Sequence, residues 1–454
     1  CEPARPGYYV SDTGSAEGTP CPAGTYNNEE GQTSEAACNW AEAGHSVPVL
    51  TQVSSGAKHT CAILDDGSVS CWGENSNGQL GDGTRSVHIE PDKVSMPLGR
   101  KALEISAGSY HTCALLDDGS VRCWGANDFG QLGDGTTIER VSPVSVDLGG
   151  TAASGVSAGE SHTCAILDDD SVKCWGDNSN GQLGDGTTTT RNTPVSVSFG
   201  GSGVHQISAG SYHTCSIMLD RTVNCWGDNW HGQLGLGSNS DSLTPRLVSV
   251  SSNSSAVTLD SGAFHTCLGM NDGKMYCWGY NAYGQLGNGG TTNSNSPIMV
   301  PLSSTQSPTS VLVGLFHSCS LFDSGDMACW GDNTEGQLGD GSQTGQLIPN
   351  LVSLSAGVLS ISVGHRHSCA VLDDASLKCW GMNSMGQLGD GGTTDSSTPA
   401  SVDLGHGSRE QVPCAPGTYQ PNESQTSCIL ADRGFSVPLE GQLGQSGCTR
   451  GEYS

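Results

Sequence analysis

Residues 54–73 read SSGAKHTCAILDDGSVSCWG, and residues 78–83 continue the motif as GQLGDG. This unit recurs seven times in the 454-residue chain, and each copy carries two cysteines ten positions apart. Successive copies start 50 to 52 residues apart. A fixed period of this length is typical of a β-propeller or a solenoid, because each repeat forms one supersecondary unit. The seven pairs are Cys61 and Cys71, Cys113 and Cys123, Cys164 and Cys174, Cys215 and Cys225, Cys267 and Cys277, Cys319 and Cys329, and Cys369 and Cys379.

Each cysteine pair is expected to bridge the two strands of one β-hairpin. We expect residues 65–67 to form a three-residue loop, a type I turn followed by a left-handed glycine. Counting back from this loop places Cys61 directly opposite Cys71. Opposed residues of antiparallel strands have α-carbons about 4.5 to 5.5 Å apart, which is within the reach of a disulfide.

The turn glycine is not present in every copy. Asp170, Arg221 and Ala375 replace it in three of the seven units. Because these residues disfavour a left-handed backbone, we expect their turns to be looser or of another type.

Two further strands complete each unit. A short strand precedes each His-Thr-Cys or His-Ser-Cys segment, and an extended segment that contains proline follows the core, as in residues 142–146. Proline suits an edge strand because it lacks a backbone donor. Four strands per unit predict an all-β, seven-bladed β-propeller with one cross-strand disulfide per blade. The phase of the repeat predicts that residues 399–404 complete the blade that holds Cys61.

The Gly-x-x-His-Thr-Cys core, the Trp-Gly after the second cysteine and the Gly-Gln-Leu-Gly tail resemble the repeat family of the regulator of chromosome condensation. This resemblance covers residues 50 to 405 and implies a seven-bladed propeller. The family includes an exchange factor for the GTPase Ran, parts of ubiquitin ligases and secreted binding proteins, so it implies no single activity. The even spacing of the units leaves no room for an inserted exchange loop, and we expect no contact with Ran.

Six cysteines outside the propeller follow a second pattern. Cys21 and Cys414 each begin a Cys-x-x-Gly-Thr-Tyr motif, with another cysteine 17 or 14 positions further on. These segments resemble the ephrin-receptor-like cysteine-rich repeats of extracellular proteins, and the resemblance pairs Cys21 with Cys38 and Cys414 with Cys428. The predicted domains are cysteine-rich modules at 1–44, the propeller at 45–407, and cysteine-rich modules at 408–454.

Cys1 and Cys448 have no partner of the right phase in this pattern. One interpretation is that the sequence is a segment of a longer polypeptide. The other joins Cys448 of one copy to Cys1 of the next, which gives a covalent head-to-tail fibre, because a contact that does not close propagates.

Charge and cysteine usage restrict the setting and the partners. Eighteen Lys and Arg against 46 Asp and Glu give a net charge of −28, whereas nucleic acid and anionic lipid require clustered cations. No apolar run approaches the roughly 20 residues of a membrane helix, so we expect no membrane insertion in this segment. Cys-x2-Cys metal motifs are absent, which favours disulfides and a secreted, extracellular or cell-surface location. There, Asn253 and Asn422 would be glycan acceptors.

No catalytic motif or cofactor site is apparent, and we expect a non-enzyme. A histidine lies two positions before each first cysteine, and we interpret these seven as structural hydrogen-bonding groups rather than ligands of a central metal or anion. The tryptophans after the second cysteines are expected to pack between blades. The Asp- and Asn-rich loops fit turn chemistry better than calcium binding. The seven histidines are His59, His111, His162, His213, His265, His317 and His367.

Blades four and five break the symmetry of the repeat with extra aromatic residues: Trp230, His231, Tyr280 and Tyr283. These could form a partner surface, because aromatic residues anchor interfaces, or could reflect ordinary drift among repeats. The sequence therefore predicts an extracellular structural or adhesive component, a subunit or segment of a fibre, with partners among its own copies or neighbouring surface proteins. The alternative is a secreted propeller that binds a protein or a glycan.

Overall fold

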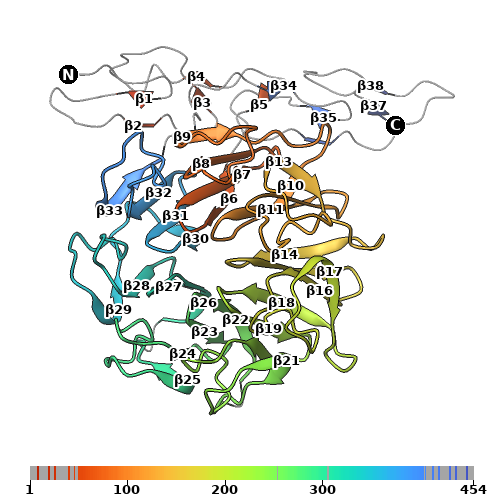
Figure 1. The fold of residues 1–454 in the computed structure, drawn as a ribbon. Coiled ribbons are helices and arrows are strands. Elements are labelled where there is room, and N and C mark those ends of the chain that lie inside the picture. The colour runs from red at the N-terminus through yellow and green to blue at the C-terminus, as the bar shows by residue number, and fades with distance from the viewer. Residues whose placement is uncertain are drawn as a thin grey trace. The chain divides into compact units, whose positions relative to one another are not determined.

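The computed structural model describes residues 50–252, 254–303, 306–402 and 404, together with the backbone of ten two-residue strands in the flanks. All regular structure among these residues is β-strand, so none of them forms a helix able to cross a membrane. Seven four-stranded antiparallel sheets follow one another along the chain and surround a common centre (Figure 1). The predicted seven-bladed propeller is confirmed.

Every blade uses four consecutive strands, ordered from the centre outward. Blade 1 contains β6 (Leu50–Ser55), β7 (His59–Leu64), β8 (Val69–Gly73) and β9 (His88–Lys93). Blade 2 contains β10 (Ala102–Ala107), β11 (His111–Leu116), β12 (Val121–Gly125) and β13 (Arg140–Ser145). Blade 3 contains β14 (Ala153–Ala158), β15 (His162–Leu167), β16 (Val172–Gly176) and β17 (Arg191–Val197). Blade 4 contains β18 (Val204–Ala209), β19 (His213–Met218), β20 (Val223–Gly227) and β21 (Ser242–Leu247).

The last three blades repeat this plan. Blade 5 contains β22 (Ala256–Ser261), β23 (His265–Met270), β24 (Met275–Gly279) and β25 (Ser294–Val300). Blade 6 contains β26 (Pro308–Val313), β27 (His317–Phe322), β28 (Met327–Gly331) and β29 (Gln346–Leu351). Blade 7 contains β30 (Val358–Val363), β31 (His367–Leu372), β32 (Leu377–Gly381) and β33 (Ser396–Ser401).

The described residues of the flanks form five antiparallel pairs of two-residue strands. The pairs are β1 (Tyr8–Tyr9) with β2 (Thr19–Pro20), β3 (Thr25–Tyr26) with β4 (Asn39–Trp40), β5 (His45–Ser46) with β34 (Val412–Pro413), β35 (Thr418–Tyr419) with β36 (Ile429–Leu430), and β37 (Phe435–Ser436) with β38 (Ser446–Gly447). The pairings of Cys21 with Cys38 and of Cys414 with Cys428, the roles of Cys1 and Cys448, the sequons at Asn253 and Asn422, and the domain limits lie outside the described residues and stay predictions.

One disulfide joins the second and third strands of every blade. The register pairs Cys61 with Cys71 and Ile63 with Val69, as counting back from the three-residue loop predicts. The α-carbons of each bonded pair lie 4.1 Å apart, closer than the spacing expected of unlinked strands. The seven predicted disulfides of the propeller are therefore present.

The turns without glycine do not differ from the others, so the prediction of a looser turn was wrong. Asp170, Arg221 and Ala375 have φ angles of 61°, 69° and 65°, in the left-handed region that Gly119 adopts at 75°. Asp170 N–H donates to Leu167 O at 2.9 Å, as Gly119 N–H does to Leu116 O. The strand register and the disulfide fix the shape of the loop, so the residue at the turn adopts the strained left-handed backbone conformation.

The prediction that residues 399–404 complete the blade of Cys61 was also wrong. The last strand of the propeller, β33, pairs with β32 of its own blade, and β9 supplies the outer strand of blade 1. Side chains and backbone groups close the ring instead. Ser55 N–H donates to Ser362 Oγ at 2.8 Å, and His365 N–H donates to Gly56 O at 3.3 Å.

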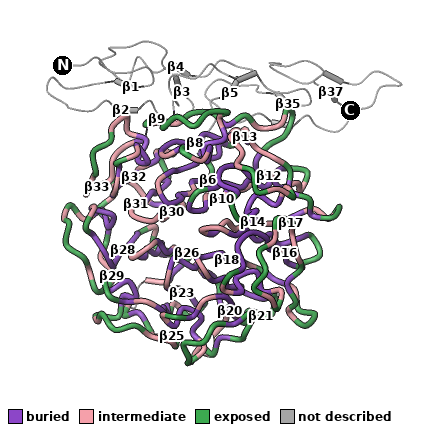
Figure 2. The backbone as a smooth tube through the Cα atoms, viewed as in Figure 1, coloured by how far each residue is buried: buried purple, intermediate pink, exposed green. Residues whose placement is uncertain are grey.

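The hydrophobic core lies between adjacent blades. One cluster combines Ile63, Val69 and Leu80 of blade 1 with Ile105 and Trp124 of blade 2. The second strand of every blade is buried along its whole length, whereas outer strands such as β9 are largely exposed (Figure 2). Each blade therefore depends on its neighbours for burial, and the prediction that the tryptophans pack between blades is confirmed.

Candidate functional site

A closed ring of hydrogen bonds links all seven blades. Each repeat histidine bonds through Nε2 to the hydroxyl of the Thr or Ser that follows the histidine of the next blade, at 2.8 to 3.0 Å. His59 thus bonds to Thr112, and His367 closes the circle on Thr60. All seven histidines are fully buried. Their interpretation as structural hydrogen-bonding groups is confirmed.

The direction of these bonds follows from the partner of each hydroxyl. Thr112 Oγ1 donates to the backbone carbonyl of Gln79 at 2.9 Å, so it can only accept from His59 Nε2. The same Gln79 carbonyl accepts a second bond from Trp124 Nε1. The Gly-Gln-Leu-Gly tail of one blade therefore anchors the hydroxyl and the tryptophan of the next blade.

Burial keeps the ring histidines neutral. It lowers the pKa of six of them to about 3 and that of His162 to about 4. Each Nδ1 atom is buried without a hydrogen-bond partner. A neutral imidazole with its proton on Nε2 donates a hydrogen bond to the hydroxyl oxygen and leaves Nδ1 as an unpaired acceptor.

The Asn- and Asp-rich loops are held by turn chemistry, as predicted. Asn178 is buried, and its Oδ1 accepts a bond from Leu183 N–H at 3.0 Å. Its Nδ2 donates to Asp185 Oδ1 and to the carbonyls of Thr187 and Thr189. One side chain therefore fixes the whole loop.

A polar channel of about 310 Å³ runs between the innermost strands. Serine side chains bridge neighbouring blades along it, as where Ala107 N–H donates to Ser54 Oγ. Two acids occupy such bridging positions. Burial raises the pKa of Glu104 to about 7 and that of Asp260 to about 6. Their hydrogen bonds join blades, from Val156 N–H to Glu104 and from Val313 N–H to Asp260, so the channel is a structural element.

The strongest departure from repeat symmetry is an aromatic cluster at one end of blades 4 to 6. Ring centroids lie 4.7 Å apart for His231 and Tyr280, 4.8 Å for Tyr283 and Phe316, and 5.4 Å for His231 and Phe264. Phe264 and Phe316 stack at 6.2 Å. We call Tyr212, His231, Phe264, Tyr280, Tyr283 and Phe316 the aromatic cluster.

Three of the four sequence-predicted surface residues belong to this cluster: His231, Tyr280 and Tyr283. Trp230 is in none of the ring contacts found among the described residues, and 77 % of its surface is exposed. Sequence reasoning missed Tyr212, Phe264 and Phe316. Each directly precedes a ring histidine, a position that is also aromatic in blade 2, at Tyr110, and that holds Lys58, Ser161 or Arg366 in the other blades. The run of aromatic residues at this position in three consecutive blades was the available signal.

The backbone explains why these positions meet. The residue after each Trp-Gly donates its N–H to the carbonyl of the residue before the histidine, as Tyr280 does to Phe264 and Asp228 to Tyr212. Equivalent pairs therefore surround the same end of the propeller. Aromatic residues fill both places in blade 5 and the first place in blades 2, 4 and 6, so only blades 4 to 6 carry them consecutively.

Acidic groups border the aromatic cluster. Tyr212 Oη donates to Glu160 Oε1 at 3.0 Å, and burial together with Glu160 raises the pKa of this phenol to about 12. Burial lowers the pKa of His231 and raises that of nearby Asp228. Glu160 and Asp228 are therefore acidic neighbours of the cluster.

Comparison with known proteins gives the family. Two matches to the model of the RCC1-like domain cover residues 22–364 and 156–419. The chain belongs to the RCC1-like domain family. It is 33 % identical over 312 residues to the ultraviolet-B receptor UVR8 of Arabidopsis thaliana. The aligned region covers 68 % of this chain and 70 % of the receptor. Human HERC2, an E3 ubiquitin-protein ligase, is 30 % identical over 59 % of this chain, which spans only 6 % of HERC2.

Solved structures share the fold of this RCC1-like chain. Human WBSCR16 has a TM-score of 0.66 at 21 % identity and covers 81 % of this chain and 94 % of its own. Yeast RCC1 (Prp20), solved bound to Kap60, has a TM-score of 0.65 at 22 % identity and covers 79 % and 85 %. A further Prp20p structure from Saccharomyces cerevisiae was described with its binding to Gsp1p and histones; it has a TM-score of 0.66 at 22 % identity and covers 78 % and 87 %.

Proposed function

We propose that this chain is a non-enzymatic, extracellular RCC1-like propeller that binds a protein partner through the aromatic cluster, as an adhesive surface component. The observation that carries the proposal is the cluster itself, six rings from three consecutive blades at one end of the propeller. Aromatic side chains are enriched at the centres of protein interfaces. Exposed Trp230, next to His231 in the sequence, extends the apolar surface on offer.

The charge of this face favours a partner with a basic segment. The paired positions at this end hold four acids against two bases, and Glu160 accepts the Tyr212 hydroxyl. The acids are Glu74, Asp177, Asp228 and Asp332, and the bases are Lys58 and Arg366. Cations bind favourably over aromatic faces, and a net charge of −28 attracts basic partners over longer distances. Lys and Arg side chains therefore suit both the rings and the acidic border.

Two further observations support the proposal. Seven disulfides within one propeller fit an oxidising, extracellular compartment. Among the proteins of similar fold, Prp20 is bound to Kap60 in its solved structure, and Prp20p binds Gsp1p and histones. Protein binding is thus a use to which this type of propeller is put.

The test is selection from a displayed library of random peptides against the oxidised full chain. The test variant removes three rings of the cluster by Tyr280→Asp, Tyr283→Asn and Phe316→Ser. Each new residue is the one that blade 3 has at the same repeat position: Asp177, Asn180 and Ser161, in that order. The control variant, Tyr110→Ser with Phe129→Asn, makes the same kind of change in blade 2.

We expect the selected peptides to be rich in Lys and Arg, and to bind the triple variant at least tenfold more weakly than the control variant. A glycan array is probed in parallel. Binding of glycans alone would replace the protein partner with a carbohydrate. Peptides that bind all variants equally would show that the aromatic cluster is not the binding surface.

A further inference from the structure

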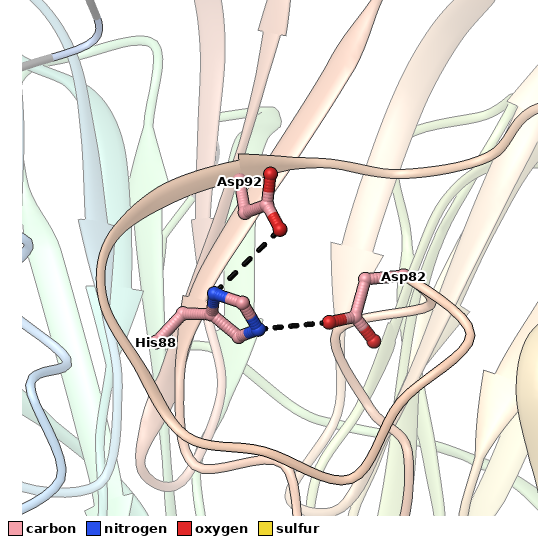
Figure 3. A group of neighbouring side chains, drawn as sticks. All are labelled: Asp82, His88 and Asp92. Carbon is pink, nitrogen blue, oxygen red and sulfur yellow. Dashed lines mark ion pairs between the residues drawn. The ribbon is translucent and has the colours of Figure 1, made fainter.

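Blade 1 contains a group of metal-ligating side chains of a kind found nowhere else among the described residues. Asp82, His88 and Asp92 each offer one ligand atom, and these atoms lie within 4.8 Å of one another (Figure 3). His88 Nε2 lies 2.9 Å from Asp82 Oδ2, and His88 Nδ1 lies 3.6 Å from Asp92 Oδ2. The imidazole therefore lies between two carboxylates.

Other blades show what usually occupies this place. In blade 2, Arg140 donates from both Nε and Nη2 to Asp134 Oδ2, and in blade 3 Arg191 does the same to Asp185. His88 has the same register as these arginines, opposite the glycine that ends the third strand. A hydrogen-bond donor with a permanent charge thus balances the aspartate in blades 2 and 3.

Blade 6 shows that the Asp92 position also reaches this aspartate. Asn350 has the register of Asp92, opposite the second cysteine, and its Nδ2 donates to Asp340 Oδ2 at 3.2 Å. In blade 1 a carboxylate replaces that amide. Two negative groups therefore converge where blades 2, 3 and 6 pair an aspartate with donors.

His88 does not satisfy both carboxylates by hydrogen bonding. Its Nε2 atom is buried and has no hydrogen-bond partner of acceptable geometry, although Asp82 Oδ2 is 2.9 Å away. A nitrogen and a carboxylate oxygen that face each other at this distance suit two ligands of one ion, since tetrahedral zinc ligands lie about 3.3 Å apart.

Asp82 is held in position by its own loop. Its Oδ1 accepts bonds from Thr84 N–H at 2.8 Å and from buried Asn75 Nδ2 at 3.2 Å. Such hydrogen bonds from neighbouring groups orient a metal-ligating carboxylate. The side chain of Asp92 is 52 % exposed on the edge strand β9, so it is free to turn toward an ion shared with His88.

We propose that Asp82, His88 and Asp92 form a binding site for a divalent transition-metal ion, with Zn²⁺ the best match. One imidazole and two carboxylates are ligands that zinc accepts, and they would neutralise its charge. Three protein ligands leave a fourth position for water or for a ligand from another molecule. The site is independent of the aromatic cluster and of the function proposed for it.

The test is titration of the oxidised full chain, freed of any polyhistidine tag, with ZnCl₂ in a calorimeter and with CoCl₂ followed by visible absorption. His88→Arg recreates the arrangement of blades 2 and 3, and Asp92→Val introduces the residue found at Val144 and Val195. His205→Arg, at an exposed histidine outside the site, is the control.

We expect one zinc ion per chain at micromolar affinity and cobalt bands of a four-coordinate site. His88→Arg should abolish both signals while the thermal unfolding profile is retained, and Asp92→Val should weaken binding at least tenfold. The His205→Arg control should bind zinc like the parent chain. Absence of zinc binding to the parent chain, or binding that persists in His88→Arg, would overturn the proposal.

Discussion

Three turn residues hold a backbone conformation that their side chains disfavour. The hairpin needs a left-handed residue after its type I turn, and Asp170, Arg221 and Ala375 supply it without being glycine. A left-handed conformation costs a residue with a Cβ about 1 to 2 kcal/mol. Glycine avoids this cost, but it loses more backbone entropy on folding, which offsets part of the gain.

Ala375→Gly should therefore raise the free energy of unfolding by about 0.5 to 1 kcal/mol. Gly325→Ala, the reverse change at the equivalent turn of blade 6, should lower it by a similar amount. Urea unfolding with the disulfides intact measures both. A stabilising effect of Gly325→Ala would show that the turn does not store the strain assigned to it.

Asp260 is a residue whose effect on stability depends on pH. Burial raises its pKa to about 6 in the folded chain, against an ordinary 3.8 when unfolded. Between these values the folded state holds a proton that the unfolded state has lost, so this contribution to stability falls as the pH rises through about 6. Serine has the same bridging role at Ser54 and Ser106.

Asp260→Ser should remove this pH-dependent loss. Relative to the parent chain, the variant should gain about 2 kcal/mol in unfolding free energy between pH 4.5 and pH 7, from the pKa difference that is removed. Chemical unfolding of both proteins at the two pH values measures the change. A constant difference between them would mean that Asp260 titrates alike in the folded and unfolded states.

At the scale of blades, every junction is built alike, including the one that joins the two ends of the propeller. Thr60 lies at the closing junction between blades 7 and 1, and Thr163 lies at an internal junction between blades 2 and 3. Both hydroxyls accept from a buried histidine and donate to a glutamine carbonyl.

Thr60→Val and Thr163→Val should each lower the free energy of unfolding by about 1 to 3 kcal/mol, because the histidine Nε2–H loses its only acceptor in a dry site. We expect the two losses to agree within about 0.5 kcal/mol. Thermal and urea unfolding give the comparison. A much smaller loss for Thr60→Val would show that the closing junction opens independently.

The hairpins could be predicted from the sequence because a short loop fixes the register, and ten residues between cysteines then place Cys61 opposite Cys71. The order of blades at the closure could not. Spacing between repeats is the same wherever a blade is taken to begin, and the exposed outer strand β9, His88–Lys93, has no apolar pattern to mark it.

The aromatic cluster was half visible in the sequence. Tyr280 and Tyr283 stand out in a loop that is otherwise polar, whereas Phe264 and Phe316 follow buried glycine-containing segments and look like core residues. Only the backbone pairing of Tyr280 with Phe264 shows that the two repeat positions face the same end.

On the scale of the whole molecule, symmetry provides stability and departures from symmetry provide chemistry. The ring of histidine, hydroxyl and carbonyl groups is complete in all seven blades. The aromatic cluster in blades 4 to 6 and the Asp82, His88 and Asp92 group in blade 1 are each found once among the described residues. The residues of each site can therefore be replaced with those that other blades have at the same repeat position, while the propeller fold is retained.

The histidine ring also predicts how the whole propeller responds to acid. The folded chain holds its ring histidines neutral, with pKa values of about 3 to 4, whereas unfolded histidine has a pKa of 6.5. Below pH 6.5 the unfolded chain binds more protons, so stability falls as the pH falls. At pH 5 the seven ring histidines and His365 each take up about one proton on unfolding, and Glu104 with Asp260 release about two.

Unfolding at pH 5 should therefore take up about six protons, which corresponds to a loss of roughly 8 kcal/mol in stability per pH unit. Calorimetric unfolding in two buffers of different ionisation enthalpy counts these protons. His213→Asn should reduce the uptake by about one proton. An uptake of only one or two protons would mean that the ring histidines are charged in the folded propeller.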